Sequence, residues 1–270
     1  MTDTEEYLQK LIESNPLREP LLREAIRTLE LPPSSNGLDA GCAVGLQAML
    51  LAEDVGPEGH IIGLDKSPDF IDIAEKMVEK SSFSDQISFK VGDVNKLPFE
   101  DNTFDWAWSS DCIGYPTGDP LLLLKELTRV IKPGGLVAIL AWSSQQLLPG
   151  YPLIEARLNA TCSAYIPLVK ESKPESNFLR ALSWFHKDGF EKPIARTFLS
   201  DVQAPLSDEI RTALISLFEM LWGEPQPGES QEDREEYERL CRPESPDFIL
   251  DLPEYYAFFT YTMFSGRVAK

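Results

Sequence analysis

The stretch Asn36-Gly-Leu-Asp-Ala-Gly-Cys-Ala-Val-Gly45 begins as a short apolar segment and ends in a turn that carries two glycines. Its first half predicts a buried strand, and the following residues, Leu46 to Ala52, have the spacing of a helix. Gly41 and Gly45 let the backbone approach a bound molecule closely. The N-terminus of the helix favours a negatively charged group such as a carboxylate. We therefore expect a ligand to bind at this strand–turn–helix unit.

Strands and helices alternate along the chain after this turn. Strands are predicted at 59–65, 86–93, 103–109 and 136–142, and helices at 68–80 and 120–131. The second of these helices ends at Lys132-Pro-Gly-Gly135, which is a typical helix stop signal. Such alternation implies a parallel sheet covered by helices on both faces, which is a doubly wound α/β fold. Ligands of such folds bind beyond the carboxyl ends of the strands.

The remaining segments complete the predicted architecture. Helices are expected at 4–14, from Pro20 to the pair Pro32-Pro33, and at 152–165, 175–187 and 205–222, and strands at 194–202 and 255–268. The result is a seven-stranded, mostly parallel sheet with a final antiparallel hairpin. We expect a helical cap over 1–35, a binding core over 36–143, and a C-terminal part over 144–270. Its insertions, 144–175 and 203–254, should build an acceptor pocket over the carboxyl edge, and the acidic run 229–254 should be a solvated face or mobile loop.

The charge of the chain narrows the classes of partner. Asp and Glu total 44 and Lys and Arg total 25, so the net charge is −19. Nucleic acids and anionic membranes bind proteins largely through Lys and Arg, so both are disfavoured as partners. No apolar run is long enough to span a membrane, and the N-terminal residues lack the pattern of a signal peptide, so we expect a cytoplasmic protein. Two histidines, and four cysteines without a CxxC spacing, do not predict a metal site.

Three carboxylates follow or end predicted strands near the expected ligand edge. Asp65 ends the second strand, 20 residues after Gly45, where a carboxylate can accept hydrogen bonds from two ribose hydroxyls. Asp93 ends the third strand and can accept from an adenine amino group, while the N–H of Val94 faces a ring nitrogen. Together with Asp39, these residues suit a nucleoside that carries an amino-acid tail.

A dinucleotide such as NAD also binds at glycine-rich turns, so the turn alone does not identify the ligand. The glycine spacing here is Gly41-x-x-x-Gly45 and not GxGxxG. The discriminating feature is that this turn is followed, in order, by Asp65, by Gly-Asp93-Val94 and by Lys-Pro-Gly-Gly135.

These motifs resemble those of class I methyltransferases that use S-adenosyl-L-methionine (SAM). Gly37 to Gly45 is similar to their first motif and Ile62-Gly-Leu-Asp-Lys-Ser-Pro68 to their second. Val91 to Phe99 and Leu124 to Leu136 resemble two later regions. The resemblance covers roughly residues 20–142. Within the superfamily, the motifs resemble those of the ubiquinone/menaquinone-biosynthesis (methyltransferase type 11) branch, whose members act on small molecules.

The resemblance implies a role for each candidate residue. Gly41, Cys42, Ala43 and Gly45 would hold the methionine tail, with Asp39 near its ammonium group; Asp65 would hold the ribose; Asp93, Val94 and the stem of Lys66 would contact the adenine; and Ser109 would line the sulfonium side. The chain departs from the family pattern at two positions. Ala43 stands where the family often has glycine, and Lys66 where an apolar residue commonly packs on the adenine.

The implied reaction is methyl transfer from SAM to an oxygen, nitrogen or carbon atom of a small-molecule acceptor, with S-adenosyl-L-homocysteine as the product. Proximity and alignment can supply most of the catalysis, because the sulfonium is already activated. A general base is needed only for an acceptor that must lose a proton early, and Asp111 and Tyr115, after the fourth strand, are candidates. A non-catalytic SAM-binding regulatory protein is the main alternative, and an NAD-dependent oxidoreductase ranks below it. The acceptor and the oligomeric state stay open.

Overall fold

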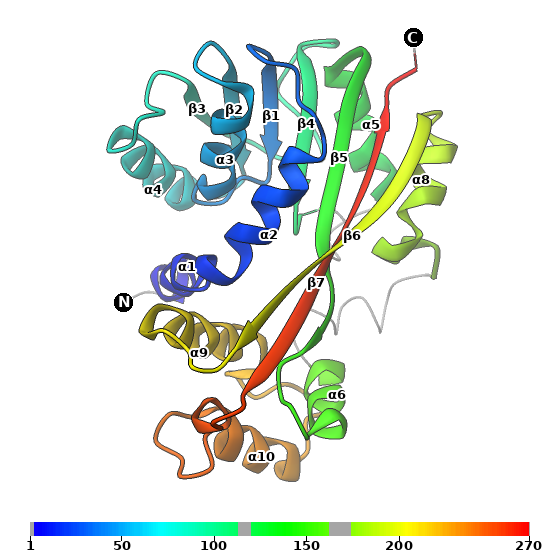
Figure 1. Ribbon diagram of the computed structural model, residues 1–270. Coiled ribbons are helices and arrows are strands. Elements are labelled where there is room, and N and C mark those ends of the chain that lie inside the picture. The colour runs from blue at the N-terminus through cyan, green and yellow to red at the C-terminus, as the bar shows by residue number, and fades with distance from the viewer. Residues whose placement is uncertain (1–2, 113–119, 162–173, 270) are drawn as a thin grey trace. The chain divides into compact units, whose positions relative to one another are not determined.

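Seven strands form one sheet in the computed structural model, which describes residues 3–112, 120–161 and 174–269. Their order is β3-β2-β1-β4-β5-β7-β6, with β1 Asn36–Ala40, β2 His60–Asp65, β3 Ile87–Val91, β4 Phe104–Ser110, β5 Ile131–Gln146, β6 Glu191–Gln203 and β7 Tyr256–Arg267. The pairs β1–β2, β1–β4, β2–β3 and β4–β5 are parallel. β7 runs opposite to its neighbours β5 and β6 (Figure 1). The predicted seven-stranded, mostly parallel α/β sheet is confirmed.

The direction in which strands are added to the sheet reverses between β1 and β4. The strands β2 and β3 extend the sheet on one side of β1, and β4 and β5 extend it on the other. Asp39 of β1 consequently lies between Gly63 of β2 and Trp108 of β4. Such a switch point leaves a crevice at the carboxyl ends of the two central strands, which is where open α/β sheets bind ligands.

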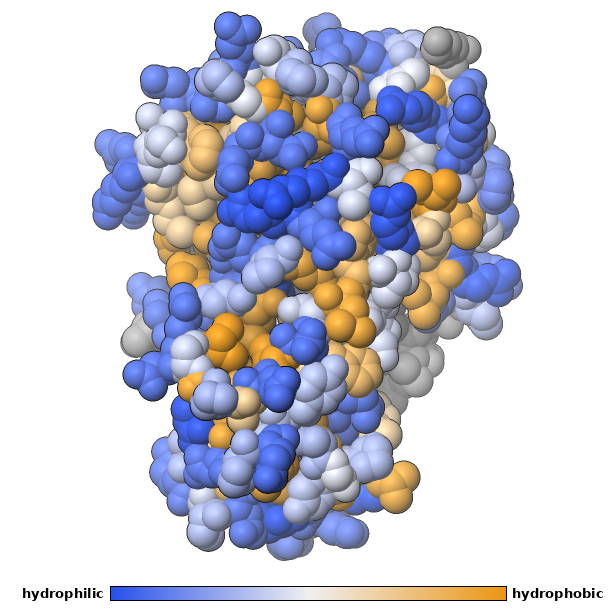
Figure 2. All heavy atoms as spheres, viewed as in Figure 1, coloured by the Kyte–Doolittle hydropathy of each residue, from blue (hydrophilic) through white to orange (hydrophobic). Residues whose placement is uncertain are grey.

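Helices cover both faces of the sheet (Figure 1). On one face, α5 (Pro120–Val130) and α8 (Ala181–Lys187) form a single apolar cluster with side chains from the sheet, among them Leu38, Leu64 and Ile139. On the other face, α3 (Leu46–Val55) and α4 (Pro68–Glu79) contact β2 and β3. The outer surface is mostly hydrophilic in the view of Figure 2, in keeping with the high net charge.

Two further helices differ from the sequence-based expectation. The helix expected to start at Pro20 is α2 (Asn15–Arg27), so Pro20 lies inside it and the predicted start is wrong. Pro20 lies beyond the first turn of α2, so its missing N–H removes one hydrogen bond from the helix. The acidic run expected as a solvated face or mobile loop contains α10 (Gln231–Cys241), whose Tyr237 is fully buried. Tyr237, Leu240 and Cys241 recur at helical spacing, so one face of this acidic helix is apolar and buried.

The segment Lys132-Pro-Gly-Gly135 lies within β5 rather than before it. The pairing of β4 with β5 jumps from Phe104 opposite Ile131 to Trp106 opposite Leu136. The proline and glycines therefore form a bulge, which gives a strand extra residues that have no partner across the ladder. The predicted helix stop is confirmed, because α5 ends just before this bulge.

The chain divides into two compact units. The first comprises Leu22–Trp142, Lys173–Phe198 and Tyr261–Lys270, and the second Met1–Leu21, Ser143–Ser172 and Leu199–Thr260. The second unit holds α1 (Asp3–Glu13), α6 (Pro152–Thr161), α9 (Asp208–Trp222) and α10. All described candidate site residues belong to the first unit. In the described parts of the chain, no helix has both the length and the apolar character needed to cross a membrane. That the insertions build an acceptor pocket stays a prediction.

Candidate functional site

The turn after β1 is bonded to the end of β2 through its backbone. The N–H groups of Gly41 and Cys42 both donate to the carbonyl of Leu64, over 2.7 and 3.0 Å. Gly41, Ala43 and Gly45 all have left-handed backbone conformations, with φ of 82°, 45° and 77°. Ala43 thus holds a conformation that suits glycine, at a cost of about 1 kcal/mol. Ala43 therefore adopts a left-handed conformation at the position where the resembled family often has glycine.

Asp65 braces this turn with its side chain. One carboxylate oxygen accepts the N–H of Ala43 at 3.1 Å, and the other accepts the N–H of Ser67 at 2.9 Å. Ser67 in turn caps α4 by accepting from the N–H of Phe70. Each carboxylate oxygen has a second lone pair, so both can still accept from ribose hydroxyls. Asp65 therefore links the shape of the turn to the predicted ribose position.

Asp39 is buried in the middle of the sheet, with 1% of its surface exposed. Burial, and secondly the charge of Asp65, raise its pKa to about 7. Among the described residues, none forms a hydrogen bond with its Oδ2 atom. A buried carboxyl oxygen without a partner is unfavourable, and such atoms in native proteins usually have a ligand, ion or water to satisfy them. This carboxyl group fits a ligand that brings N–H donors.

The two serines at the end of β4 have different surroundings. Ser109 donates its hydroxyl to the carbonyl of Ala40 at 2.7 Å. Ser110, with 7% of its surface exposed, has no hydrogen-bond partner for its hydroxyl among the described residues. Asp39 lies opposite Trp108, so alternation along β4 puts Ser110 on the same sheet face as Asp39. Ser110 was missed from the sequence, although the strand register identifies it.

Asp93 and Val94 follow β3 at the same edge of the sheet. The N–H of Gly92 donates to the carbonyl of Asp65 at 2.9 Å, which holds the ends of β2 and β3 together. The carboxylate of Asp93 is exposed and accepts the backbone and side-chain N–H groups of Asn95, and the backbone bond first of all lowers its pKa. Val94 is half-buried and Lys66 is exposed. The structure therefore groups the predicted adenine residues beside Asp65.

Asp111 is held by two elements that the sequence did not connect with it. Its Oδ1 accepts the backbone N–H of Trp142 at 3.0 Å, and its Oδ2 accepts the hydroxyl of Tyr261 at 2.8 Å. Trp142 and Tyr261 were not predicted as site residues. Tyr115, the other candidate base, lies outside the described residues. Asp111 is thus anchored to β5 and β7 at the end of β4.

The cysteines near the turn are buried thiols. Burial, followed by the charges of Asp39 and Asp65, raises the pKa of Cys42. Burial likewise raises the pKa of Cys112 to about 11. Both therefore stay protonated at neutral pH. In the described part of the chain, no cluster of three or more His, Cys, Asp or Glu could hold a metal ion.

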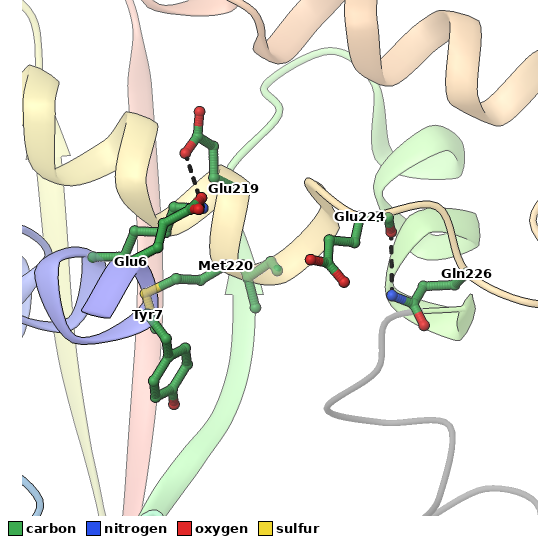
Figure 3. Close-up of a pocket in the computed structure, with 8 residues that line it drawn as sticks. Glu6, Tyr7, Glu219, Met220, Glu224 and Gln226 are labelled. Carbon is green, nitrogen blue, oxygen red and sulfur yellow. Dashed lines mark hydrogen bonds and ion pairs between the residues drawn. The ribbon is translucent and has the colours of Figure 1, made fainter. Parts of the chain in front are cut away.

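A separate groove lies in the second unit, between α1 and α9 (Figure 3). Lys10 pairs there with the carboxylates of Glu6 and Glu219, at 2.7 and 3.2 Å. The other residues that line the groove are Tyr7, Met220, Leu221, Glu224 and Gln226. None of them is a predicted site residue, so this groove is not the predicted ligand site.

Comparison with known proteins gives three kinds of similarity. The model of a family described as "Methyltransferase domain" matches residues 33–195. A demethylmenaquinone methyltransferase of Bacillus cereus (strain ATCC 10987 / NRS 248) is 30% identical over 196 residues, which are 67% of this chain and 81% of that protein.

Two solved structures have a similar fold. A SAM-dependent methyltransferase from Aquifex aeolicus superimposes with a TM-score of 0.51 at 22% identity, over 68% of this chain and 87% of the other. Phosphoethanolamine N-methyltransferase 2 of Haemonchus contortus, solved with SAM, gives 0.55 at 18% identity, over 92% of this chain and 52% of the other. The last two support the fold alone.

Proposed function

The chain belongs to the class I SAM-dependent methyltransferases, and from that premise we propose that it transfers a methyl group from SAM to an oxygen, nitrogen or carbon atom of a small-molecule acceptor. When bound, SAM supplies an activated methyl group on a positively charged sulfur, and S-adenosyl-L-homocysteine is the product. The residues of this chain then have to hold the nucleoside and the amino-acid tail, and leave the methyl group open to the acceptor.

The observation that carries this proposal is the pair of polar atoms without partners among the described residues, Oδ2 of Asp39 and Oγ of Ser110. Both lie on one face of neighbouring strands, beside the glycine turn. An ammonium group has three N–H donors, which is enough for both oxygens. Asp39 and Ser110 would accept from the ammonium group of the methionine tail. Among the described residues, no side chain caps α3, so its first N–H groups would donate to the tail carboxylate.

The nucleoside would lie along the ends of β2 and β3. Asp65 would accept from the two ribose hydroxyls with the lone pairs that Ala43 and Ser67 leave free. Asp93 would accept from the adenine amino group, and the backbone N–H of Val94 would donate to the ring. The ribose would thus lie at β2 and the adenine at β3, which are neighbouring strands of the sheet.

The net charge of the chain and the names of its relatives both favour a small-molecule acceptor. The net charge of −19 disfavours a nucleic-acid acceptor. The relatives at 30% identity are named demethylmenaquinone methyltransferases, which act on a small organic molecule by that name. Both oxygens of Asp111 already accept hydrogen bonds from the protein, which suits a structural brace more than a general base. We therefore propose a reaction that depends on positioning the acceptor in line with the methyl group.

Calorimetric titration of the wild-type protein with SAM, S-adenosylhomocysteine and NAD tests the proposal. SAM and S-adenosylhomocysteine are expected to bind and NAD is not. Incubation with methyl-labelled SAM and a metabolite mixture is then expected to label a small molecule. Binding of NAD without SAM would overturn the assignment. Binding of SAM without transfer to any acceptor would support the regulatory alternative instead.

Ser110 and its neighbour Ser109 provide a matched pair for testing the ammonium site. Ser110→Ala is expected to weaken SAM binding by about five- to tenfold, because one hydrogen bond is lost, without lowering the free energy of unfolding. Ser109→Ala leaves the buried carbonyl of Ala40 without its donor, so it should lower the free energy of unfolding by about 1–3 kcal/mol. Because Ser109 lies on the opposite sheet face from Asp39, we expect SAM affinity to stay within about twofold, against the sulfonium-lining role that the resemblance implies for this residue. Calorimetry and urea unfolding measure the two quantities. The reverse pattern would place the ammonium group elsewhere.

A further inference from the structure

The end of β4 is connected to β5 by a side chain in place of backbone. β4 ends at Ser110, whereas β5 continues to Gln146. The N–H of Asp111 still donates to the carbonyl of Leu140 at 2.8 Å, and there the ladder stops. The next available N–H of β5, that of Trp142, is taken at 3.0 Å by Oδ1 of Asp111. The carboxylate therefore replaces the missing strand at this point.

Tyr261 of β7 fixes the other half of this carboxylate. Its hydroxyl donates to Oδ2 of Asp111 at 2.8 Å, and only 1% of the residue is exposed. Its ring lies edge-on to the ring of Trp142, with the centroids 5.4 Å apart and the planes at 69°. Both carboxylate oxygens of Asp111 are therefore held, one by β5 and the other by β7.

The backbone of Asp111 leaves the strand in a left-handed conformation, with φ of 50°. This turn directs Cys112 onto the glycine turn after β1. A Cβ atom added to Gly41 would lie 2.6 Å from Sγ and 2.8 Å from Cβ of Cys112, so the two residues are in direct contact. The contact couples the position of Cys112 to the shape of the turn that Gly41 opens.

We propose that Tyr261 is a positioning residue for cofactor binding. Through Asp111 it holds Cys112 against Gly41, and so keeps the glycine turn in the shape that receives the methionine tail. Tyr261 itself needs no contact with SAM in this arrangement. The inference rests on the proposed function, since it assigns that tail to this turn.

Tyr261→Phe tests the proposal, with Tyr255→Phe as its matched control. Tyr255 is equally buried, and its hydroxyl donates to the carbonyl of Leu147 at 3.0 Å, within the second unit. Each variant loses one buried phenol hydrogen bond, so each should melt about 2–4 °C lower. Only Tyr261→Phe is expected to weaken SAM binding, by about tenfold in calorimetry. The KM for SAM should rise in the same proportion, while kcat changes less.

A double-mutant cycle tests whether Tyr261 acts through Asp111. If it does, the variant that combines Tyr261→Phe with Asp111→Asn binds SAM about as weakly as Asp111→Asn alone. The proposal would be overturned if the double variant lost affinity by the product of the two single losses. An equal loss of affinity in Tyr255→Phe would overturn it too. So would wild-type affinity in Tyr261→Phe.

The alkylation rate of Cys112, followed by peptide mass spectrometry without SAM, gives a readout that does not need the cofactor. Tyr261→Phe should raise this rate several-fold, because Cys112 is no longer pressed against Gly41, and Tyr255→Phe should not. An unchanged rate in Tyr261→Phe overturns the proposal. If the wild type fails to bind SAM, the proposed function fails, and the cofactor role of Tyr261 with it. If the wild type binds and Tyr261→Phe binds equally well, only the role of Tyr261 fails.

Discussion

Replacement of Asp65 by alanine is expected to weaken SAM binding by more than about a hundredfold. Two ribose hydroxyls would lose a charged acceptor, and each such hydrogen bond contributes about 1.5–3 kcal/mol. A hundredfold change corresponds to about 2.7 kcal/mol, so the two bonds alone account for it. The substitution also removes the acceptor for the N–H groups of Ala43 and Ser67, which loosens the turn before any ligand arrives. Calorimetric titration of wild type and variant measures the effect.

Asp69→Ala is the matched control for this experiment. Asp69 is an exposed carboxylate in the first turn of α4, four residues further along the chain. Its removal takes away the same charge near the same helix, yet should change SAM affinity by no more than about twofold. Equal losses in the two variants would mean that general electrostatics, and not the position of Asp65, determine binding. Wild-type affinity in Asp65→Ala would overturn the ribose assignment.

Replacement of Asp39 by asparagine is expected to have opposite effects on stability and on binding. The pKa of Asp39 is raised from 3.8 to about 7, so the folded protein keeps a proton that the unfolded chain releases near pH 4. The stabilisation that depends on this proton is therefore lost as the pH rises from about 4 through 7. Asparagine cannot ionise. At pH 5, about one unit above the unfolded pKa, the variant should already be more stable than the wild type by about 1–2 kcal/mol. At pH 8 the difference should grow to about 4 kcal/mol at most, since one pH unit between the two pKa values corresponds to about 1.4 kcal/mol.

SAM affinity should move the other way in the same variant. A carboxylate that pairs with an ammonium group binds it best when ionised, so wild-type affinity should increase as the pH rises from 6 to 7.5. Asp39→Asn should bind at least about tenfold more weakly at pH 7.5, with little dependence on pH over this range. Urea unfolding at pH 5 and 8, together with calorimetry at pH 6 and 7.5, covers both quantities. Unchanged affinity in the variant would remove Asp39 from the tail site, and unchanged stability at pH 8 would contradict its buried charge.

The sequence was sufficient to predict the strand–turn–helix unit and the carboxylates that follow the next strands, because their positions depend on local pattern. Gly41, Asp65 and Asp93 each follow from a strand, a turn and a spacing that lie within a few residues of them. The choice between Ser109 and Ser110 needed one more step, the register of β4 against β1, which places the unpartnered hydroxyl on the same face as Asp39. No local pattern contains that register.

Residues that meet through the order of the strands could not be predicted in this way. Asp111 and Tyr261 are 150 positions apart and meet because the chain places β7 beside β5. The buried side of α10 was missed for a related reason. Its sequence is strongly acidic, and only the packing in the second unit shows that Tyr237 is enclosed.

The sheet order β5-β7-β6 has a consequence for how the chain reaches its native state. β6 precedes β7 along the chain, but β7 lies between β5 and β6. During synthesis the gap between those two strands must stay open until the last strand emerges, with the backbone groups of both edges unpaired. Unpaired strand edges are prone to join other chains, and long-range pairing forms slowly. The parallel strands β3, β2, β1 and β4 can pair with one another before β7 is synthesised. The half that carries Tyr261 is therefore the last to assemble and the step most exposed to misfolding.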